Sequence, residues 1–316
     1  MGLGAMTTMR PEQLDPGEVS LRVHYSSINY KDALAATGKG KIIRRFPCVG
    51  GIDMAGVVTA SSDPRFAPGD EVIATSFDIG VAHHGGYAEM ARVPGRWVLR
   101  LPAGMSLLQA MALGTAGFTA ALGIVRMEAN GLAPGNGPVL VTGATGGVGG
   151  LAIDMLARNG YHVVALTSKA DQAAYLRGLG AAEIKTLDSI DLSRTRPLEE
   201  SLWAGAVDNV GGRILHWVLA TMTQAGTVAS IGNASSFEIA TTVFPFILRG
   251  VSLLGVDSGY MGFPTRQHVW DRLASDLAPR HLESMTRVIE FDDLPGAFDD
   301  FVQGRVKGRT VVRISG

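Results

Sequence analysis

Hydrophobic and polar positions divide the chain into regions with two different periods. Between about Glu18 and Leu101, short runs of alternating apolar and polar residues are separated by turn signals such as Pro68-Gly69-Asp70 and Gly85-Gly86. A period of two is typical of strands with one buried face. The runs are VSLRVHYSSI, AGVVTA, DEVIAT, GYAEMARV and WVLRLP. Short strands at such spacing predict a small, partly closed antiparallel barrel.

From Gly137 to about Gly255, continuous apolar runs alternate with helical patterns. Continuous runs are typical of strands that are buried on both faces of a parallel sheet. The strand candidates are residues 138–143, 162–168, 182–187, 206–210, 226–232 and 252–257. Six strands with right-handed βαβ connections predict an α/β fold with a doubly wound parallel sheet.

Two helical patterns and one strand lie outside these regions. Residues Leu107–Met127 predict a helix that is interrupted around Gly114-Thr115-Ala116-Gly117, and Arg266–Ala278 predicts an amphipathic helix. The segment Arg309–Ile314 (RTVVRI) predicts a final strand. The simplest arrangement returns this strand to the N-terminal barrel.

The stretch VLVTGATGGVG, residues 139–149, carries the most specific signal. A short apolar run ends in glycines that open a helical pattern, as in the strand–turn–helix of a dinucleotide-binding unit. Gly146 and Gly149 leave room for the backbone to approach a pyrophosphate, although Ala144 stands where the usual pattern has its first glycine. The N–H groups at the start of the helix then favour an anion.

The next strand indicates which dinucleotide is bound. A carboxylate about 20 residues after the glycines would hold the ribose 2′-hydroxyl of NAD. Here the strand ends in Thr167, Ser168 and Lys169, with no carboxylate before Asp171. Two hydroxyls and an ammonium suit a 2′-phosphate, which a carboxylate would repel. The sequence therefore favours NADP(H) over NAD(H), although Lys169 also fits a solvated helix start.

Composition narrows the class of protein. The length of 316 residues fits two domains. A formal charge of −1 leaves no basic footprint for nucleic acid, and no apolar run of transmembrane length or secretory leader stands out. Cys48 is the single cysteine and only His83-His84 are adjacent histidines, so no metal site is expected. These features predict a cytoplasmic protein without a nucleic-acid or membrane partner.

The order of these parts resembles the medium-chain dehydrogenase/reductase superfamily, in its quinone-oxidoreductase-like branch. Longer segments look like the NADPH-dependent acrylyl-CoA reductase family: NYKDALAATGKGKIIRRFPCVGGIDMAGVV (29–58), SSDPRFAPGDEV (61–72), GTAGFTA (114–120), RPLEESLWAGAVDNVGG (196–212), TTVFPFILRGVSLLGVDS (241–258) and GRTVV (308–312). The resemblance implies metal-free reduction of acryloyl-CoA, a 2-enoyl thioester, to propanoyl-CoA. It also implies a homodimer, a GroES-like antiparallel β-barrel catalytic domain (residues 1–113, with 259–316 returning to it) and an NADP-binding Rossmann domain (residues 114–258).

The resemblance further implies roles for individual residues. Tyr30 would lie beside the nicotinamide, and Thr145, Gly146, Gly147 and Val148 would hold the pyrophosphate. Thr167, Ser168 and Lys169 would hold the 2′-phosphate, while Asn233, Ile247 and Ser258 would line the cofactor. Zinc-dependent relatives carry Gly-His-Glu where this chain has Gly51-Ile52-Asp53, and Ile52 cannot bind zinc. The start, MGLGAMTTMRPEQL, does not resemble the strand pair with which family members usually begin.

Enoyl reduction needs a hydride at Cβ, a proton at Cα and stabilisation of the charge on the thioester oxygen. The Tyr30 phenol or solvent would supply the proton, and Asn29 could polarise a carbonyl or orient the nicotinamide amide. Alternatively, Tyr30 is a half-buried aromatic residue of the barrel and Asn29 is a turn residue, and neither takes part in the reaction. Lys39, Lys41, Arg44 and Arg45 form a basic group that would receive CoA phosphates or else be a solvated face. Arg249 and Arg309 are further candidates.

Two other functions stay open at this point. One is a quinone or general enone reductase with the same cofactor site, and the other is a non-enzymatic NADPH-binding sensor or structural protein. A short-chain reductase is excluded. Although TGATGGVG fits that family's glycine motif, none of the six tyrosines has a lysine four residues on.

Overall fold

The computed structural model describes residues 4–315, which form two compact units. The first unit comprises the chain up to Ala116, the segment Ser258–Ala274 and the chain from Leu282 onward. The second unit comprises Gly117–Asp257 and the short segment Ser275–His281.

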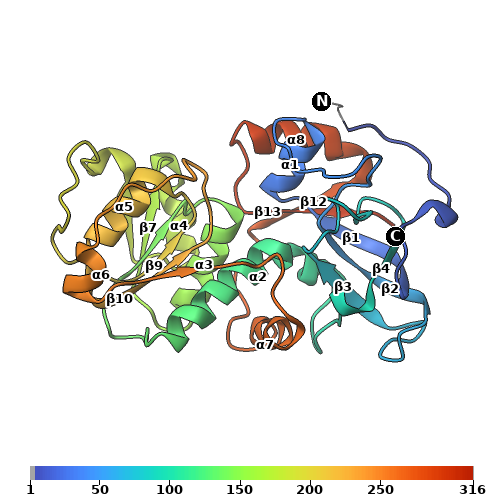
Figure 1. Cartoon of the computed structure of the whole chain (residues 1–316), viewed down its shortest axis with the longest axis horizontal. Helices are drawn as coiled ribbons and strands as arrows, with labels where there is room; N and C mark the ends of the chain where they lie inside the picture. The colour runs from blue at the N-terminus through green and yellow to red at the C-terminus, as the bar shows by residue number, and fades with distance from the viewer. Residues whose placement is uncertain (1–3, 316) are drawn as a thin grey trace. The chain divides into compact units, whose positions relative to one another are not determined.

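A seven-stranded sheet forms the frame of the first unit (Figure 1). Its strand order is β12-β13-β1-β2-β3-β5, and β4 also pairs with β1. The bounds are β1 (Val19–Ser27), β2 (Asp53–Ser61), β3 (Glu71–Thr75), β4 (Met90–Val93), β5 (Val98–Arg100), β12 (Thr286–Glu290) and β13 (Arg309–Arg313). The predicted return of the last strand is confirmed, because β13 pairs antiparallel with β1. The antiparallel pairing predicted for the strands between Glu18 and Leu101 is confirmed, and β12, a strand that the sequence did not predict, adds one parallel pair with β13.

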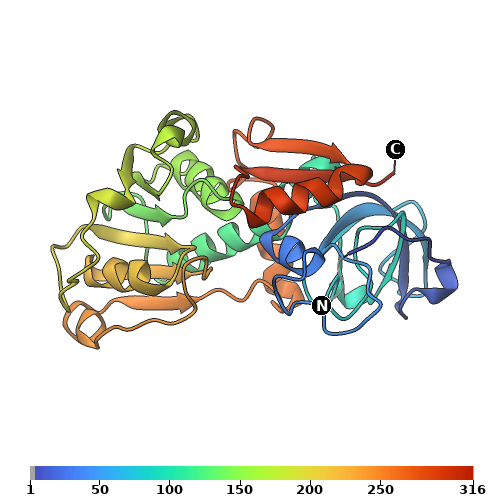
Figure 2. The same cartoon turned by 90° about the horizontal axis from the view of Figure 1, so that it is seen from above.

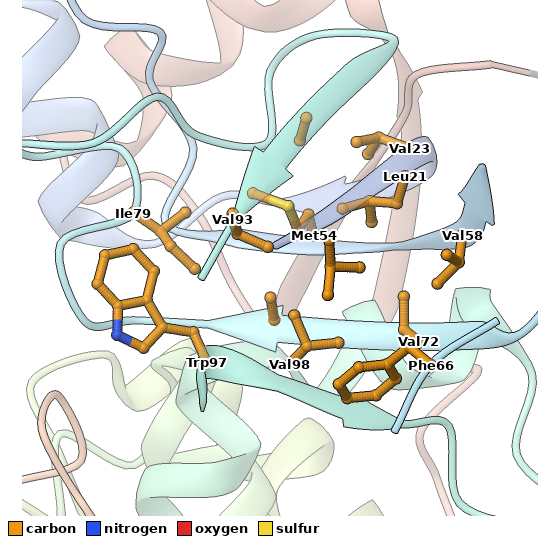
Figure 3. Packing of buried hydrophobic residues seen from close by; sticks show 13 residues of the cluster. Leu21, Val23, Met54, Val58, Phe66, Val72, Ile79, Val93, Trp97 and Val98 are labelled. Carbon is orange, nitrogen blue, oxygen red and sulfur yellow. The ribbon is translucent and has the colours of Figure 1, made fainter. Parts of the chain in front are cut away.

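The core of this sheet follows from the alternation along β1. Val19, Leu21 and Val23 are fully buried, while Arg22 between them is exposed. Figure 3 shows the side chains of Leu21 and Val23 gathered with Met54 and others from neighbouring strands. The period-two pattern therefore sets which face of the strand is buried.

Two short helices cover a second apolar cluster of the same unit. Helix α1 (Tyr30–Ala36) follows β1 directly, and α8 (Leu294–Val302) precedes β13. Ile28 and Ala33 share a buried cluster with Leu294 and Phe298, so α1 and α8 lie side by side, as Figure 2 also shows in blue and red. The amphipathic helix predicted at Arg266–Ala278 is present as α7 (Phe263–Leu273).

The second unit contains a six-stranded, all-parallel sheet with strand order β11-β10-β9-β6-β7-β8. The prediction of a doubly wound sheet is confirmed, because the order reverses at β6, the first strand of the series. The strands are β6 (Val139–Thr142), β7 (Val163–Thr167), β8 (Glu183–Thr186), β9 (Trp203–Asp208), β10 (Met222–Ser230) and β11 (Ser252–Gly255). The helices are α3 (Gly147–Arg158), α4 (Ala173–Gly178), α5 (Gly212–Ala220) and α6 (Phe244–Arg249) (Figure 1).

Helix α2 (Leu107–Ala129) contains the division between the units, after Ala116. The predicted interruption is confirmed, because Gly114 has non-helical angles (φ 51°, ψ −153°). By length and composition α2 is the one helix within residues 4–315 that could cross a membrane, which the sequence prediction did not register. Its apolar stretch is 78% buried inside the protein, as is typical of a core helix.

Candidate active site

The glycine-rich loop of the second unit joins β6 to α3. Gly146 is the N-cap of α3 and makes no side-chain cap, and Gly147 and Val148 begin the helix. A Cβ on Gly149 would lie 2.4 Å from the carbonyl oxygen of Gly143, so the loop and helix approach too closely for any other residue. Backbone N–H groups at the start of a helix with no side-chain cap suit a pyrophosphate. Thr145, within this loop, is buried.

The end of β7 presents one hydroxyl and one ammonium at the surface. Thr167 is buried, and its hydroxyl accepts a hydrogen bond from the Lys169 N–H (3.0 Å). Ser168 is exposed and Lys169 is half-buried. Asp171 is exposed and accepts a hydrogen bond from Gln172 (2.5 Å). This arrangement fits a 2′-phosphate, with Thr167 shaping the turn that carries Ser168 and Lys169.

Asn233, Ile247 and Ser258 lie on three different segments. Asn233 is exposed shortly after β10, and Ile247 is exposed on α6, both in the second unit. Ser258 belongs to the first unit, where its carbonyl oxygen accepts a hydrogen bond from Arg266 (2.9 Å).

Sequence reasoning missed a polar pair at the point where the strand order reverses. Thr142 ends β6 and donates to the buried carboxylate of Asp208 (2.7 Å), which ends β9. Asn209 follows, and its amide donates to the Thr142 carbonyl (2.7 Å). Burial raises the pKa of Asp208. The signal was the polar pair Asp208-Asn209 at the end of a buried strand, at the edge where doubly wound sheets bind their ligands.

In the first unit, β1 is followed by Asn29 and Tyr30, which begin α1. The Tyr30 side chain is 54% exposed. Its hydroxyl makes no hydrogen bond within the described residues and is available to a ligand. The Asn29 amide nitrogen instead donates to Asp53 (2.8 Å) and to Asp32 (3.3 Å).

Asp53 lies at the start of β2 and is completely buried. Its carboxylate accepts hydrogen bonds from the Ser27 hydroxyl (2.6 Å), the Thr115 N–H (2.9 Å) and the Thr115 hydroxyl (2.5 Å), as well as from Asn29. Arg309 is also buried, and it donates to the Ser27 hydroxyl (3.1 Å). The guanidinium therefore reaches the carboxylate through a shared hydroxyl.

Asp32 is the second buried carboxyl group of this network. It accepts hydrogen bonds from the Asn29 N–H (2.9 Å) and the Ile52 N–H (3.0 Å). Burial, and then the neighbouring Asp53 carboxylate, raise the pKa of Asp32 to about 7. Burial likewise lowers the pKa of Arg309 and raises that of Tyr87, whose hydroxyl donates to the Ser27 carbonyl (3.1 Å).

The four basic residues differ in their surroundings. Arg44 pairs with Asp78 and Arg45 with Asp15, while neither Lys39 nor Lys41 makes an ion pair in the part of the chain that the structure describes. Both lysines are exposed. The additional candidates Arg249 and Arg309 are wrong as phosphate ligands. Arg249 donates to the carbonyls of residues 199, 220 and 222, and Arg309 is buried in the network around Asp53.

Cys48 and the two adjacent histidines have structural roles. The thiol lies 3.4 Å from the His83 carbonyl, and burial raises its pKa to about 11. His84 accepts a hydrogen bond from the Val49 N–H (3.0 Å), and Asp15 lies beside both imidazoles. No group of three or more histidine, cysteine or carboxylate side chains suited to a metal occurs among residues 4–315.

Two family descriptions match this chain. The Alcohol dehydrogenase GroES-like domain matches residues 15–103, and Zinc-binding dehydrogenase matches residues 147–276. The barrel and the doubly wound sheet thus define a dehydrogenase of the medium-chain dehydrogenase/reductase superfamily.

Individual relatives narrow this class. The chain is 47% identical over 302 residues to acrylyl-CoA reductase AcuI of Ruegeria pomeroyi, covering 96% of this chain and 92% of the relative. It is 48% identical over 308 residues to YhfP of Bacillus subtilis, covering 97% and 93%; YhfP carries the provisional name quinone oxidoreductase. The crystal structure of YhfP with NAD bound superposes with a TM-score of 0.95.

A Salmonella enterica oxidoreductase, YhdH, was crystallised in complex with NADP. Its structure superposes with a TM-score of 0.96 at 47% identity, covering 99% of this chain and 96% of that chain. Identities of this size over nearly the whole length show the family. The chain belongs to the acrylyl-CoA reductase family of NADPH oxidoreductases.

Proposed function

We propose that the protein uses NADPH to reduce the carbon–carbon double bond of a short 2-enoyl-CoA thioester, without a metal. The proposed principal substrate is acryloyl-CoA, which would be reduced to propanoyl-CoA. The observation that carries this proposal is the 47% identity to acrylyl-CoA reductase AcuI over 96% of the chain. The metal-free part is supported by Ile52, a side chain that cannot coordinate zinc.

The proposed cofactor is NADP(H). Its pyrophosphate would bind backbone N–H groups of the loop Thr145–Val148 other than that of Gly146, which donates to the Gly143 carbonyl (3.0 Å). Its 2′-phosphate would bind Ser168 and Lys169, on the turn that Thr167 shapes. Asn233, Ile247 and Ser258 are proposed to line the rest of the cofactor. Lys169→Asp should lower the ratio of NADPH to NADH turnover at least tenfold, because a carboxylate repels the 2′-phosphate. An unchanged ratio would place the 2′-phosphate elsewhere.

The bound nicotinamide supplies the hydride that reaches Cβ of the substrate. The electron pair of the double bond then moves toward the thioester oxygen, and Cα takes a proton. We assign to the exposed Tyr30 hydroxyl a hydrogen bond to this oxygen or the delivery of the proton. Tyr30→Phe should lower kcat while NADPH binding stays within about twofold, and unchanged turnover would remove Tyr30 from both roles.

Recognition of the CoA phosphates is assigned to Lys39 and Lys41. Both are exposed without an ion-pair partner among the described residues, whereas Asp78 and Asp15 neutralise Arg44 and Arg45. Lys39→Ala/Lys41→Ala should raise KM for acryloyl-CoA and weaken its dependence on salt. Arg45→Ala is the matched control, because its charge is already paired; an equal rise in KM would contradict this assignment.

One substrate panel tests the proposal. Oxidation of NADPH is followed with acryloyl-CoA, crotonyl-CoA and benzoquinone, and each assay is repeated with NADH. Fast turnover of acryloyl-CoA with NADPH alone is expected. Turnover of benzoquinone alone would favour a quinone reductase, the alternative that the similarity to YhfP supports. Tight NADPH binding with none of the substrates reduced would favour a non-enzymatic sensor or structural protein.

We also propose that the protein is a cytoplasmic homodimer. The edge strand β11 and the segment before it carry exposed apolar side chains, which are Phe237, Val243, Phe244, Leu248 and Leu253. Several large apolar side chains exposed within one stretch of the chain support a protein–protein contact. Light scattering should give twice the chain mass, and Leu253→Lys should yield monomers. A monomeric parent protein would refute the dimer.

The proposed cytoplasmic location is supported by Cys48, the single cysteine, because a chain with one cysteine forms no internal disulfide and suits a reducing compartment.

A further inference from the structure

The Asn29 side chain bridges two buried carboxyl groups of the first unit. Its amide nitrogen donates to Asp53 Oδ2 (2.8 Å) and Asp32 Oδ2 (3.3 Å), and its backbone N–H donates to the same Asp32 oxygen (2.9 Å). Asp53 is 0% exposed and Asp32 is 4% exposed. The bridge joins β2 to the first turn of α1.

This geometry uses all the donor capacity of the side chain. A primary amide has two N–H hydrogens, and here the amide nitrogen lies within hydrogen-bond distance of one oxygen of each carboxyl group. The reverse orientation of the amide would place its oxygen against two acceptors, so the neighbours fix the direction of the group. The only polar atom left is Oδ1, which accepts hydrogen bonds and therefore cannot polarise a substrate carbonyl.

Further hydrogen bonds stabilise the two buried carboxyl groups that the Asn29 side chain joins. Asp53 receives further hydrogen bonds from Ser27 and Thr115, and the buried Arg309 reaches it only through Ser27. The hydroxyl of Tyr87 donates to the Ser27 carbonyl (3.1 Å), and burial, followed by the charges of both carboxyl groups, raises the pKa of this phenol. Buried carboxylates are costly without donors, so loss of the amide leaves each of them with one donor fewer.

We propose that Asn29 is a positioning residue that fixes the first residue of α1, Tyr30, by bridging Asp53 and Asp32. Tyr30 follows Asn29 directly, and its own side chain makes no hydrogen bond within the described residues, so the bridge next to it sets the direction of its backbone. This inference rests on the role proposed above for the Tyr30 hydroxyl. It replaces the expectation that the Asn29 amide acts on the substrate.

A double-mutant cycle tests the inference. Asn29→Ala should lower kcat about 10- to 100-fold, with KM for acryloyl-CoA and Kd for NADPH changed less than threefold. Asn29→Ala/Tyr30→Phe should be no slower than Tyr30→Phe alone, because both changes remove the same hydroxyl contact. Multiplicative losses would mean that Asn29 acts on the substrate independently, and a full kcat with a lower Tm would mean a purely structural role. Either result overturns the inference.

A charge exchange provides the second measurement and applies even where Asn29→Ala is poorly folded. Asn29→Asp brings three carboxyl groups together and should lose activity increasingly as the pH rises. Asn29→Asp/Asp53→Asn restores the amide–carboxylate contact between positions 29 and 53 with its polarity reversed, while the carboxyl group at position 29 still lies beside Asp32. It should therefore recover about tenfold of the lost kcat at low pH and less as the pH rises. A folded double variant with no recovery overturns the inference.

Failure of the inference is distinguishable from failure of the proposed function. If Asn29→Ala is slow but Tyr30→Phe is as fast as the parent, positioning of Tyr30 is refuted while the substrate panel still identifies the reaction. If the parent reduces none of the activated alkenes, the proposed function fails and the inference fails with it.

Discussion

Gly114 offers the sharpest test of the buried network, because its position combines backbone strain with a close approach. Its angles (φ 51°, ψ −153°) lie in a region that is nearly exclusive to glycine, where another residue costs about 1–3 kcal/mol. A Cβ there would lie 2.6 Å from Asp53 Oδ2, 2.8 Å from Ser27 Oγ and 2.9 Å from an Arg309 nitrogen. Displacing one buried charged hydrogen bond adds about 2 kcal/mol. Gly114→Ala should therefore lower the free energy of unfolding by roughly 3–5 kcal/mol.

Gly104 provides a matched control in the same unit. It also has a positive φ (82°), but a Cβ there would meet nothing within 4 Å. Gly104→Ala should therefore cost only the backbone term, about 1 kcal/mol. Urea unfolding of both variants at one pH, followed by circular dichroism, measures the difference. Equal losses would show that the network around Asp53 accommodates a methyl group, and the close-approach argument would be refuted.

Three further predictions concern the cofactor loop, pH and the thiol. Gly149→Ala pushes on the Gly143 carbonyl and should raise Kd for NADPH at least tenfold by fluorescence titration, whereas Gly178→Ala, where a Cβ meets nothing within 4 Å, should leave it unchanged. The raised pKa of Asp32, about 7, means that the folded protein binds this proton more tightly than the unfolded chain, so stability should fall as pH rises from about 4 to about 7. Asp32→Asn should abolish this loss of stability, which amounts to about 2–4 kcal/mol between the two pH values, and urea unfolding at several pH values measures it. A variant profile parallel to that of the parent protein would contradict the assignment. Cys48, with a pKa of about 11, should be alkylated far more slowly at pH 7 than a free thiol, as mass spectrometry would show.

The parallel sheet was predictable because its central strands show a continuous apolar pattern in their own sequence. Val139–Thr142 and Val163–Thr167 are buried at every position, and burial on both faces produces the continuous apolar runs that the sequence displays. The break in α2 was equally local, since glycine is the residue that permits the angles found at Gly114. Such elements can be predicted from a short stretch of sequence, because they do not depend on residues far away in the chain.

Strand β12 was not predicted, for a physical reason. Of its five residues only Ile289 is buried, because β12 lies at the edge of the sheet and pairs with β13 alone. An edge strand with one buried position shows no alternation to detect. The parallel pairing depends on β13, whose register no local pattern specifies.

The glycine-rich loop between β6 and α3 was predictable for the same reason as the sheet, because its glycines form one contiguous motif. The network around Asp53 was not, since its partners lie far apart in sequence: Asn29 is 24 residues away, and Arg309 lies 282 residues from the Ser27 hydroxyl that it contacts. A cation such as Arg309 therefore resembles a phosphate ligand until its burial is known.

In the segment Gly51-Ile52-Asp53, hydrogen bonds of this network hold the backbone and the carboxylate in place. Ile52 is 4% exposed and donates its N–H to Asp32, while Asp53 is held by hydroxyl, amide and backbone donors. Replacing Ile52 by histidine would place an imidazole at a buried position between two carboxyl groups that already have hydrogen-bond donors. The Cys48 thiol faces backbone carbonyls. A zinc site would therefore require several simultaneous changes, because a zinc ion bound here would have to displace the hydrogen bonds that Asp32 and Asp53 now accept.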